Sequence, residues 1–279
     1  MNKLALKAPA KINLALQVLK KREDGYHNIN SIMTRVPIYD EIVFEAADRL
    51  SLECDADLGI APEQNLVYKA ARLFLDEFKI TAGVKISLSK TIPAGGGLGG
   101  GSSDCATTLL GLAKFFGIKN ADDAMYKIAC SLGSDIPFFL REGTAIATSR
   151  GEVLEYFDFT LPWEVLLVAP GFSVNTGKAY SELDKRKFCS KPAKFADILP
   201  QIAAFPRLMP LMFRNDFMYP EMPNCPEIRF IVKQLYASGA LFASMSGSGS
   251  TCFGLFADPA ALESSLRYFG NYRTLRGKF

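Results

Sequence analysis

Apolar and polar residues alternate over residues 11–18, whose sequence is KINLALQV. This period of two predicts a β-strand with one buried and one exposed face. Lys11 and Asn13 are two positions apart, so the pattern places both side chains on the same face of that strand. Further alternation at 32–45 and 49–54 predicts that the strand belongs to an antiparallel sheet.

A helical period first appears at 65–78, with Asn65 in the position of an N-cap. An alternating strand at 84–88 follows and leads into a run of glycines. Beyond the glycines, an apolar stripe predicts a helix that ends at Gly117. A further helix is predicted at 122–132.

The order of the predicted elements differs in the second half of the chain, where strands are interspersed with helices. The elements predicted there are strands at 163–169, 240–245 and 251–256, and helices near 176–185, 195–204, 227–238 and 259–269. We therefore predict two domains, 1–158 and 159–279, although no clear linker marks the boundary.

Composition narrows the class of protein. The chain has 279 residues, of which 49% are hydrophobic and 22% charged, and its net charge of +3 is too small to indicate a nucleic-acid partner. Lysines interrupt the apolar residues at the N-terminus, and no apolar run is long enough to span a membrane. Six cysteines, at 54, 105, 130, 189, 225 and 252, show neither zinc-site nor disulfide spacing. We therefore expect a cytoplasmic protein with reduced thiols and no membrane partner.

The sequence PAGGGLGGGSSDCA at 93–106 has six glycines within seven positions. It contains no lysine, so it is not the common G-x-x-x-x-G-K-[ST] phosphate loop. The run instead lies between a predicted strand and the N-terminus of a predicted helix. The unpaired N–H groups and the dipole of a helix N-terminus can bind an anion without a basic side chain. The pattern therefore predicts a local phosphate site.

Three other interpretations of the glycines are weaker. Gly95, Gly97 and Gly100 fit the dinucleotide-binding pattern G-x-G-x-x-G, but the preceding KISLSK alternates, whereas the first strand of such a site is nearly all apolar. A protein-kinase loop would be accompanied by an H-R-D triplet, and the only histidine of the chain is His27, in GYHN. A flexible linker would rarely stand between a strand and a well-marked helix.

Several motifs, in order, resemble those of the GHMP kinases, the superfamily of galactokinase, homoserine kinase, mevalonate kinase and phosphomevalonate kinase. They are APAKINLALQVLKKREDGYHNINSIM (8–33), NLVYKAARLF (65–74), the glycine run with SSD, LGSDIPFFLREGTA (132–145), NDF (215–217) and MSGSGSTCFGLF (245–256). The resemblance implies an α+β fold of two domains, an N-terminal mixed-sheet nucleotide-binding domain and a C-terminal α/β-sandwich domain. It also implies ATP, with Mg²⁺, as cofactor.

The motifs are most similar to those of the GHMP kinases that act on a cytidine diphosphate-linked methylerythritol. This implies transfer of a phosphoryl group from ATP to the 2-hydroxyl of that substrate, a step on the non-mevalonate route to isopentenyl diphosphate. The resemblance identifies Asp135 as the base that accepts the hydroxyl proton and Lys11 as the cation that polarises the hydroxyl. The alternatives are a turn or N-cap aspartate before Pro137 and a solvated strand lysine.

The remaining site residues also follow from the resemblance. Those assigned to ATP and its phosphates are Asn65, Pro93, Ala94, Gly95, Gly96, Gly97, Leu98, Gly99, Gly100, Gly101, Ser102 and Ser103. Those assigned to the acceptor are Asn13, Tyr26, His27, Thr176, Tyr180, Gly247, Ser248 and Gly249. The two serine hydroxyls are suited to phosphate oxygens or Mg²⁺, although helix capping competes for one of them. Asp104 is assigned to the helix terminus, and the metal ligands stay open.

Within the acceptor set, the resemblance places Tyr26 and Tyr180 against the cytosine and His27 at its hydrogen-bonding edge. Ordinary packing is the alternative for Tyr180. Two positions depart from the family: Cys105 stands in place of an alanine and Ser149 in place of a frequent glycine. A homoserine or mevalonate kinase, or a nucleotide-binding module without catalysis, stays open as a second interpretation. We expect a monomer or a weak homodimer.

Overall fold

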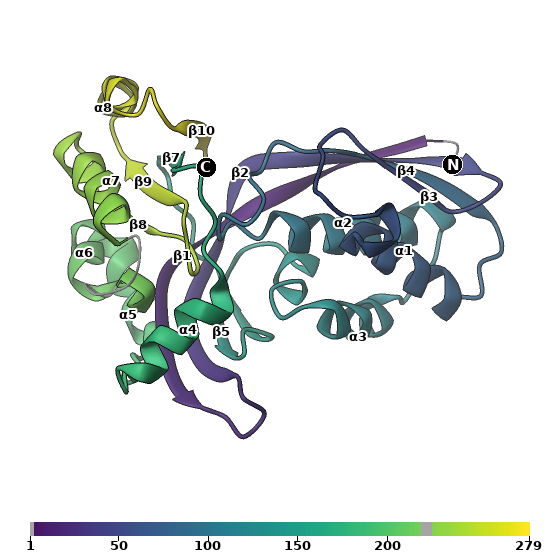
Figure 1. The fold of residues 1–279 in the computed structure, drawn as a ribbon, viewed down its shortest axis with the longest axis horizontal. Coiled ribbons are helices and arrows are strands. Elements are labelled where there is room, and N and C mark those ends of the chain that lie inside the picture. Colours follow the sequence, from purple (N-terminus) through teal and green to yellow (C-terminus); the bar gives the residue numbers. More distant parts are fainter. Residues whose placement is uncertain (1–2, 219–224) are drawn as a thin grey trace. The chain divides into compact units, whose positions relative to one another are not determined.

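The computed structural model describes residues 3–218 and 225–279 of the chain (Figure 1). The chain forms two compact units, each assembled from separate stretches. The first unit comprises Met1–Ala10, Ile38–Ala94 and Gly99–Glu142, and the second comprises Lys11–Pro37, Gly95–Leu98 and Gly143–Phe279. The predicted domain boundary near residue 158 divides the sequence in another way and stays a prediction.

Two long strands contribute to both units. These are β1 (Lys3–Lys21) and β2 (His27–Ala47), which pair with each other. In the first unit, the second half of β2 pairs antiparallel with β4 (Gly83–Ser89), and β3 (Ser51–Cys54) pairs parallel with β4. The predicted strands around 32–45, 49–54 and 84–88 are thereby confirmed, whereas the sheet is mixed rather than purely antiparallel.

The helices of the first unit match the predicted ones, except that the second begins within the glycine run and not beyond it. They are α1 (Leu66–Glu77), α2 (Gly100–Phe116) and α3 (Asp122–Leu132), with short 3₁₀ turns η1 (Pro62–Gln64) and η2 (Pro137–Leu140). Asn65 caps α1, because its Oδ1 accepts a hydrogen bond from the Val67 N–H at 2.9 Å. Gly117 ends α2 at a φ of 68°, which only glycine adopts at little cost.

The helices pack closely on this sheet. A Cβ atom placed on Gly111 of α2 would lie only 2.3 Å from the ring of Phe44 on β2. The absence of a side chain at Gly111 therefore lets the helix backbone approach the buried face of the sheet. This contact fixes the helix that begins directly after the glycine run.

The second unit contains the first half of β2 and a separate four-stranded sheet. The first half of β2 pairs antiparallel with β5 (Thr144–Ser149), which pairs with β6 (Val153–Phe157). The other sheet is antiparallel throughout, in the order β10 (Arg273–Lys278), β7 (Glu164–Ala169), β9 (Cys252–Phe256), β8 (Phe242–Met245). Strand β10 was not predicted, because the sequence RTLRGK carries little apolar alternation.

The helices of the second unit largely match the prediction. They are α4 (Thr176–Lys185), α5 (Phe195–Ala204), α6 (Met209–Met212), α7 (Cys225–Ala237) and α8 (Pro259–Ser265), with 3₁₀ turns η3 (Pro206–Leu208), η4 (Asp216–Met218) and η5 (Leu266–Tyr268). The short helix α6 was not predicted.

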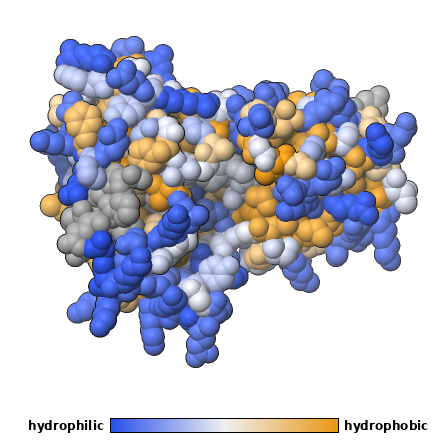
Figure 2. Space-filling model, viewed as in Figure 1, coloured by the Kyte–Doolittle hydropathy of each residue, from blue (hydrophilic) through white to orange (hydrophobic). Residues whose placement is uncertain are grey.

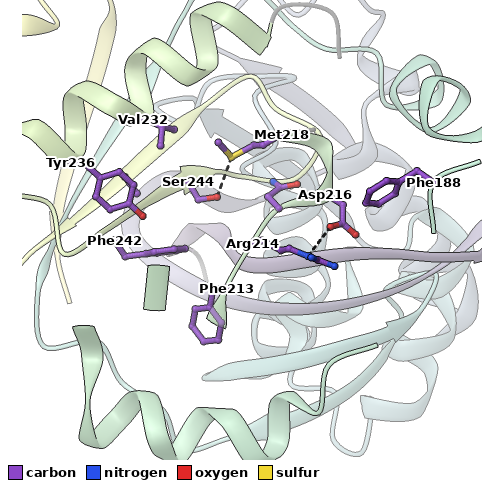
Figure 3. A pocket seen from close by; sticks show the side chains of 11 residues that line it. Phe188, Phe213, Arg214, Asp216, Met218, Val232, Tyr236, Phe242 and Ser244 are labelled. Carbon is purple, nitrogen blue, oxygen red and sulfur yellow. Dashed lines mark hydrogen bonds and ion pairs between the residues drawn. The ribbon is translucent and has the colours of Figure 1, made fainter. Parts of the chain in front are cut away.

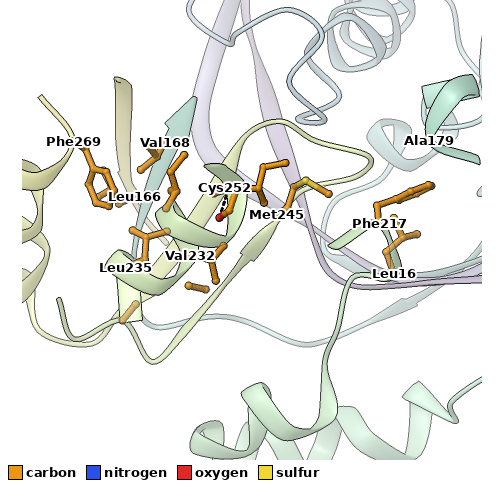
Figure 4. Close-up of a cluster of buried hydrophobic side chains, with 14 of the residues drawn as sticks. Leu16, Leu166, Val168, Ala179, Phe217, Val232, Leu235, Met245, Cys252 and Phe269 are labelled. Carbon is orange, nitrogen blue, oxygen red and sulfur yellow. Dashed lines mark hydrogen bonds between the residues drawn. The ribbon is translucent and has the colours of Figure 1, made fainter. Parts of the chain in front are cut away.

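One hydrophobic cluster joins the start of the chain to its C-terminal part (Figure 4). Leu16 of β1 and Phe217 of η4 belong to it, together with Leu166 of β7, Leu235 of α7 and Met245 of β8. All are buried, and burial of one such side chain contributes about 1.5–3 kcal/mol to stability. The strand that carries Lys11 and Asn13 is thus anchored in this core.

The prediction that one face of β1 is exposed is wrong. Lys11, Asn13 and Gln17 are all buried, with exposed fractions of 3%, 3% and 6%. Packing on both sides of β1 covers the polar face as well as the apolar one. The polar side chains of this strand must therefore find their partners inside the protein.

The surface is mixed in character. Figure 2 shows hydrophilic and hydrophobic residues interspersed on the face in view. Exposed large apolar side chains include Leu73 of α1, Tyr126 of α3 and Leu211 of α6. Within the described residues, every helix is too short or too polar to cross a membrane.

Candidate functional site

The last three glycines of the run, Gly99 to Gly101, form the N-cap and the first residues of α2. They are the part of the run suited to binding phosphate. The N-cap, Gly99, has a φ of 68°, and within the described residues no side chain caps this helix end. The N–H groups of the first turn therefore point out of the helix without the usual capping oxygen. Ser103 is fully buried, and its Oγ has no hydrogen-bond partner among the described residues. This donor-rich end fits an anion such as phosphate.

Residues 95–98 of the run belong to the second unit, where two of their backbone carbonyls accept hydrogen bonds. The Thr251 N–H donates to the carbonyl of Gly96 at 3.1 Å, and Ser246 Oγ donates to that of Gly97 at 2.7 Å. A Cβ atom on Gly97 would lie 2.1 Å from the carbonyl oxygen of Ser246, and its φ is 79°. Glycine is therefore required there by both space and backbone conformation.

Lys11 lies directly beside this loop. Its backbone N–H donates to the carbonyl of Leu98 at 2.9 Å. Its buried Nζ donates to Oδ1 of Asn13 at 2.6 Å, which confirms that the two side chains share one face of β1. The same Oδ1 accepts the backbone N–H of Gly247 at 2.9 Å. One amide oxygen thus joins the strand cation to the C-terminal glycine motif.

Other side chains hold this network in place. Asn13 Nδ2 donates to Ser31 Oγ at 2.8 Å. Asn215 Nδ2 donates to the carbonyls of Met245 and Gly247, at 2.7 and 2.8 Å. Asp216 Oδ2 accepts the backbone N–H of Val18 at 2.7 Å. The NDF motif therefore supports both β1 and the C-terminal glycine motif, a role that its sequence had not indicated.

A cavity of about 430 Å³ lies against this motif (Figure 3). Its lining includes the aromatic rings of Phe188, Phe213 and Phe242 together with Arg214 and Asp216, whose side chains form an ion pair at 3.2 Å. Burial raises the pKa of Asp216 above its ordinary value. None of these residues was among the predicted site residues.

In the first unit, Asp135 and Asn65 occupy separate turns. Asp135 is half-buried between α3 and η2. The N-cap of η2 is Ile136, so Asp135 lies in the turn directly before that cap. Asn65 is buried and lines a cavity of about 160 Å³ together with apolar residues such as Leu52 and Leu58.

A buried charged cluster joins the start of the glycine run to α2. Lys90 Nζ contacts Asp40 and donates to Asp104 Oδ2 at 2.6 Å. Asp40 Oδ1 also accepts the N–H groups of Thr91 and Ile92, which directly precede the run. Burial raises the pKa of Asp104 to about 7, with Lys90 opposing the rise and the Asp40 carboxylate adding to it. Sequence analysis missed Lys90 and Asp40 because their partners are distant in the chain.

The aromatic residues predicted for the acceptor lie near the turn between β1 and β2. The ring of His27 stacks on that of Tyr180, with centroids 5.0 Å apart and planes at 12°. Tyr26 is 57% exposed, and the guanidinium of Arg150 lies over its ring at 5.1 Å. Ser149 has a φ of 62°, which explains why glycine suits this position in the family.

The second unit thus brings together many of the predicted residues. Lys11, Asn13, residues 95–98 and Gly247 share one hydrogen-bonded network, and Thr176 Oγ1 lies 2.8 Å from Ser248 Oγ. Gly249 donates its N–H to the carbonyl of Ser246 in the same glycine motif. The residues that belong to the first unit are Asn65, Pro93, Ala94, Gly99, Gly100, Gly101, Ser102, Ser103 and Asp135. The predicted actions of Asp135 and Lys11 on the acceptor hydroxyl stay predictions.

Family models recognise both halves of the chain. A model described as the GHMP kinases N terminal domain matches residues 65–143, and one described as GHMP kinases C terminal matches residues 198–272. The chain therefore belongs to the GHMP kinases. The predicted α+β fold and the predicted class of enzyme, an ATP-dependent kinase, are confirmed.

The matches to individual relatives name a particular kinase within this family. The chain is 38% identical over 280 residues to the 4-diphosphocytidyl-2-C-methyl-D-erythritol kinase of Chlorobium phaeobacteroides (strain BS1), covering 96% of this chain and 94% of the relative. It also matches a crystal structure of 4-(cytidine 5'-diphospho)-2C-methyl-D-erythritol kinase with a TM-score of 0.83 and 31% identity, over 98% of each chain.

A mevalonate kinase is a more distant match. The L. major mevalonate kinase crystallised with R-mevalonate superposes with a TM-score of 0.75, at 17% identity over 99% of this chain and 97% of the other. At that identity, the match supports the shared fold and nothing finer.

Proposed function

We propose that the protein transfers a phosphoryl group from ATP to the 2-hydroxyl of 4-diphosphocytidyl-2-C-methyl-D-erythritol. The observation that carries this proposal is the contact of Lys11 with the glycine loop. Its backbone bonds to Leu98, and its ammonium shares Asn13 with Gly247. A buried cation beside a phosphate loop is suited to neutralising charge on a transferring phosphoryl group.

The phosphates of ATP are proposed to bind at the start of α2. The uncapped N–H groups and the unpaired Ser103 hydroxyl support this assignment. The cavity beside Asn65 supports an adenine site, because its lining is mostly apolar and Asn65 adds a polar side chain.

Mg²⁺ is proposed to accompany the nucleotide. Within residues 3–218 and 225–279, no three His, Cys, Asp or Glu side chains gather as a metal site. Mg²⁺ is commonly bound by substrate phosphates and few protein ligands, and the nucleotide is therefore proposed to carry it. Ser102 and Ser103 are the residues proposed to meet the metal or the phosphate oxygens, where the cation would neutralise phosphate charge.

The acceptor is proposed to bind along the second unit, with Asn13 and the C-terminal glycine motif near its methylerythritol end and His27, Tyr26 and Tyr180 near its cytosine. Asp135 is proposed to accept the proton of the 2-hydroxyl. We further propose that the protein is cytoplasmic and a monomer or weak homodimer.

A coupled ADP-release assay tests the function. The purified chain is offered 4-diphosphocytidyl-2-C-methyl-D-erythritol, mevalonate and homoserine in separate reactions with ATP and Mg²⁺. We expect turnover with the cytidylyl substrate only. Turnover restricted to mevalonate or homoserine would favour another GHMP kinase. Absence of turnover with all three, from a protein that binds ATP, would favour a silent nucleotide-binding module.

A further inference from the structure

Helix α4 presents three side chains at a spacing of four residues. Thr176, Tyr180 and Asp184 therefore lie on one face of the helix. Thr176 contacts Ser248 of the C-terminal glycine motif, Tyr180 stacks on His27, and Asp184 bonds to His27. At a rise of 1.5 Å per residue, the first and last of these positions are about 12 Å apart. One helix face thus connects the glycine motif to His27.

Asp184 determines the hydrogen-bonding pattern of the His27 ring. Nε2 of His27 lies 2.8 Å from Oδ1 of Asp184. An ionised carboxylate only accepts hydrogen bonds, so Nε2 carries the proton in this contact. A neutral imidazole with its proton on Nε2 has a lone pair on Nδ1. Among the described residues, Nδ1 has no hydrogen-bond partner, so the ring presents an acceptor that the fold leaves unused.

Lys21 completes the arrangement. Its Nζ lies 2.5 Å from Oδ2 of Asp184, and this hydrogen bond is the main reason that the pKa of Asp184 lies below its ordinary value. The carboxylate is therefore ionised at neutral pH, and an ammonium already balances its charge. His27 needs to supply only a hydrogen bond to the other oxygen.

The ring is also held in its plane. His27 is buried, and Tyr180 covers one face of its imidazole. Tyr180 in turn packs edge-on against Phe217, with ring centroids 4.9 Å apart. Rotation of His27 would break both the stacking and the bond to Asp184. The direction of Nδ1 is therefore fixed before any ligand binds, which lowers the entropic cost of recognition.

We propose that Asp184 is a positioning residue for base selection, which orients His27 so that Nδ1 accepts a hydrogen bond from the exocyclic amine of cytosine. Uracil carries a carbonyl oxygen at the corresponding position, and two lone pairs would then face each other. A site built to pair with a donor discriminates strongly against an analogue that lacks it. This inference rests on the proposed function, because it assumes a cytidylyl substrate.

The kinetic test compares wild type with Asp184→Ala, using 4-diphosphocytidyl-2-C-methyl-D-erythritol and its uridylyl analogue. We expect the variant to raise KM for the cytidylyl substrate about tenfold, the effect of about one hydrogen bond, with kcat within about twofold of wild type. The preference for cytidylyl over uridylyl substrate should fall by at least about tenfold. Glu182→Ala, which removes the exposed ion pair with Lys185 on the same helix, should leave both values unchanged.

A spectroscopic test measures the tautomer of His27 directly. His27 is the only histidine in the chain, so its ring nitrogens give unambiguous ¹⁵N NMR signals. We expect the Nε2–H tautomer in wild type and a mixture of tautomers in Asp184→Ala. A wild-type protein in the Nδ1–H tautomer, or an Asp184→Ala variant with unchanged base preference, would overturn the inference. If wild type does not turn over the cytidylyl substrate at all, the proposed function fails instead.

Discussion

Asp135 and Lys11 are the residues on which the proposed chemistry depends. Lys11 is buried and bonded to Asn13, and its backbone is bonded to the glycine loop. Asp135 stands in a turn whose N-cap is a different residue. A buried cation beside the glycine loop suits phosphoryl transfer, and the base role of Asp135 stays a prediction.

For Asp135 we predict that Asp135→Asn lowers kcat by about 10²–10⁴, the usual contribution of a general base. The affinity for ATP should stay unchanged, because the amide keeps the size of the side chain and removes only its basicity. Steady-state kinetics and calorimetric titration with ATP provide the measurement. Asp123→Asn, at an exposed position in the first turn of α3, is the matched control. A kcat close to wild type in Asp135→Asn would remove the base role.

Asp104 shows how an environment sets the properties of one residue. It is buried against Lys90, and its Oδ1 has no hydrogen-bond partner among the described residues. Burial raises the pKa of this carboxyl to about 7, and the contact with Lys90 opposes the rise. The sequence had assigned Asp104 to the helix terminus, whereas its side chain instead pairs with Lys90 in front of the glycine run.

The glycine run lies between a strand and a long helix that are closely packed. The strand β4 delivers the chain to the run, and α2 leaves from it. Within the run, glycine is required to different degrees. Gly97 has no room for a Cβ, whereas a Cβ on Gly101 would meet only Leu66, at 3.9 Å.

We predict that Gly97→Ala destabilises the protein by at least about 2 kcal/mol, because it combines a left-handed conformation with a backbone clash. Gly101→Ala should change the free energy of unfolding by no more than about 1 kcal/mol, since alanine is favoured over glycine in a helix. Urea denaturation of both variants measures the difference. Equal stabilities would show that the loop backbone can shift to accommodate a side chain at position 97.

At the scale of the whole molecule, the buried cluster of Lys90, Asp40 and Asp104 makes stability depend on pH. The folded state raises the pKa of Asp104 from 3.8 to about 7. Between these values the folded protein binds more protons than the unfolded chain, so the free energy of unfolding falls as pH rises. Lys90 has a raised pKa, so its contribution is lost only in the alkaline range.

We therefore predict that the contribution of Asp104 lowers the free energy of unfolding by on the order of 2 kcal/mol between pH 5 and pH 8. Asp104→Asn, which cannot ionise, should flatten this dependence. The exposed Asp76, paired with Arg72 at the surface, supplies the control variant Asp76→Asn, whose pH dependence should match wild type. Urea denaturation across this range is the measurement, and an unchanged slope in Asp104→Asn would contradict the prediction.

The sequence by itself determined what is local. The period of the apolar residues predicted α1 to α3 and most strands, and Asn65 and Gly117 marked helix ends. The absence of lysine from the glycine run excluded the common phosphate loop and favoured a helix N-terminus as the phosphate site. These features follow from backbone sterics and hydrogen bonding within a few residues. The spacing of Lys11 and Asn13 also sufficed to place them on one face.

Only the tertiary structure decided which distant polar groups meet. The partner of His27 is Asp184, that of Asn13 is Gly247, and that of Lys90 is Asp104 on the far side of the glycine run. No local pattern encodes such pairs, because burial creates them: a polar group removed from water needs a partner, and packing determines which one is near. For the same reason, the polar face of β1 is buried although its alternation indicated exposure.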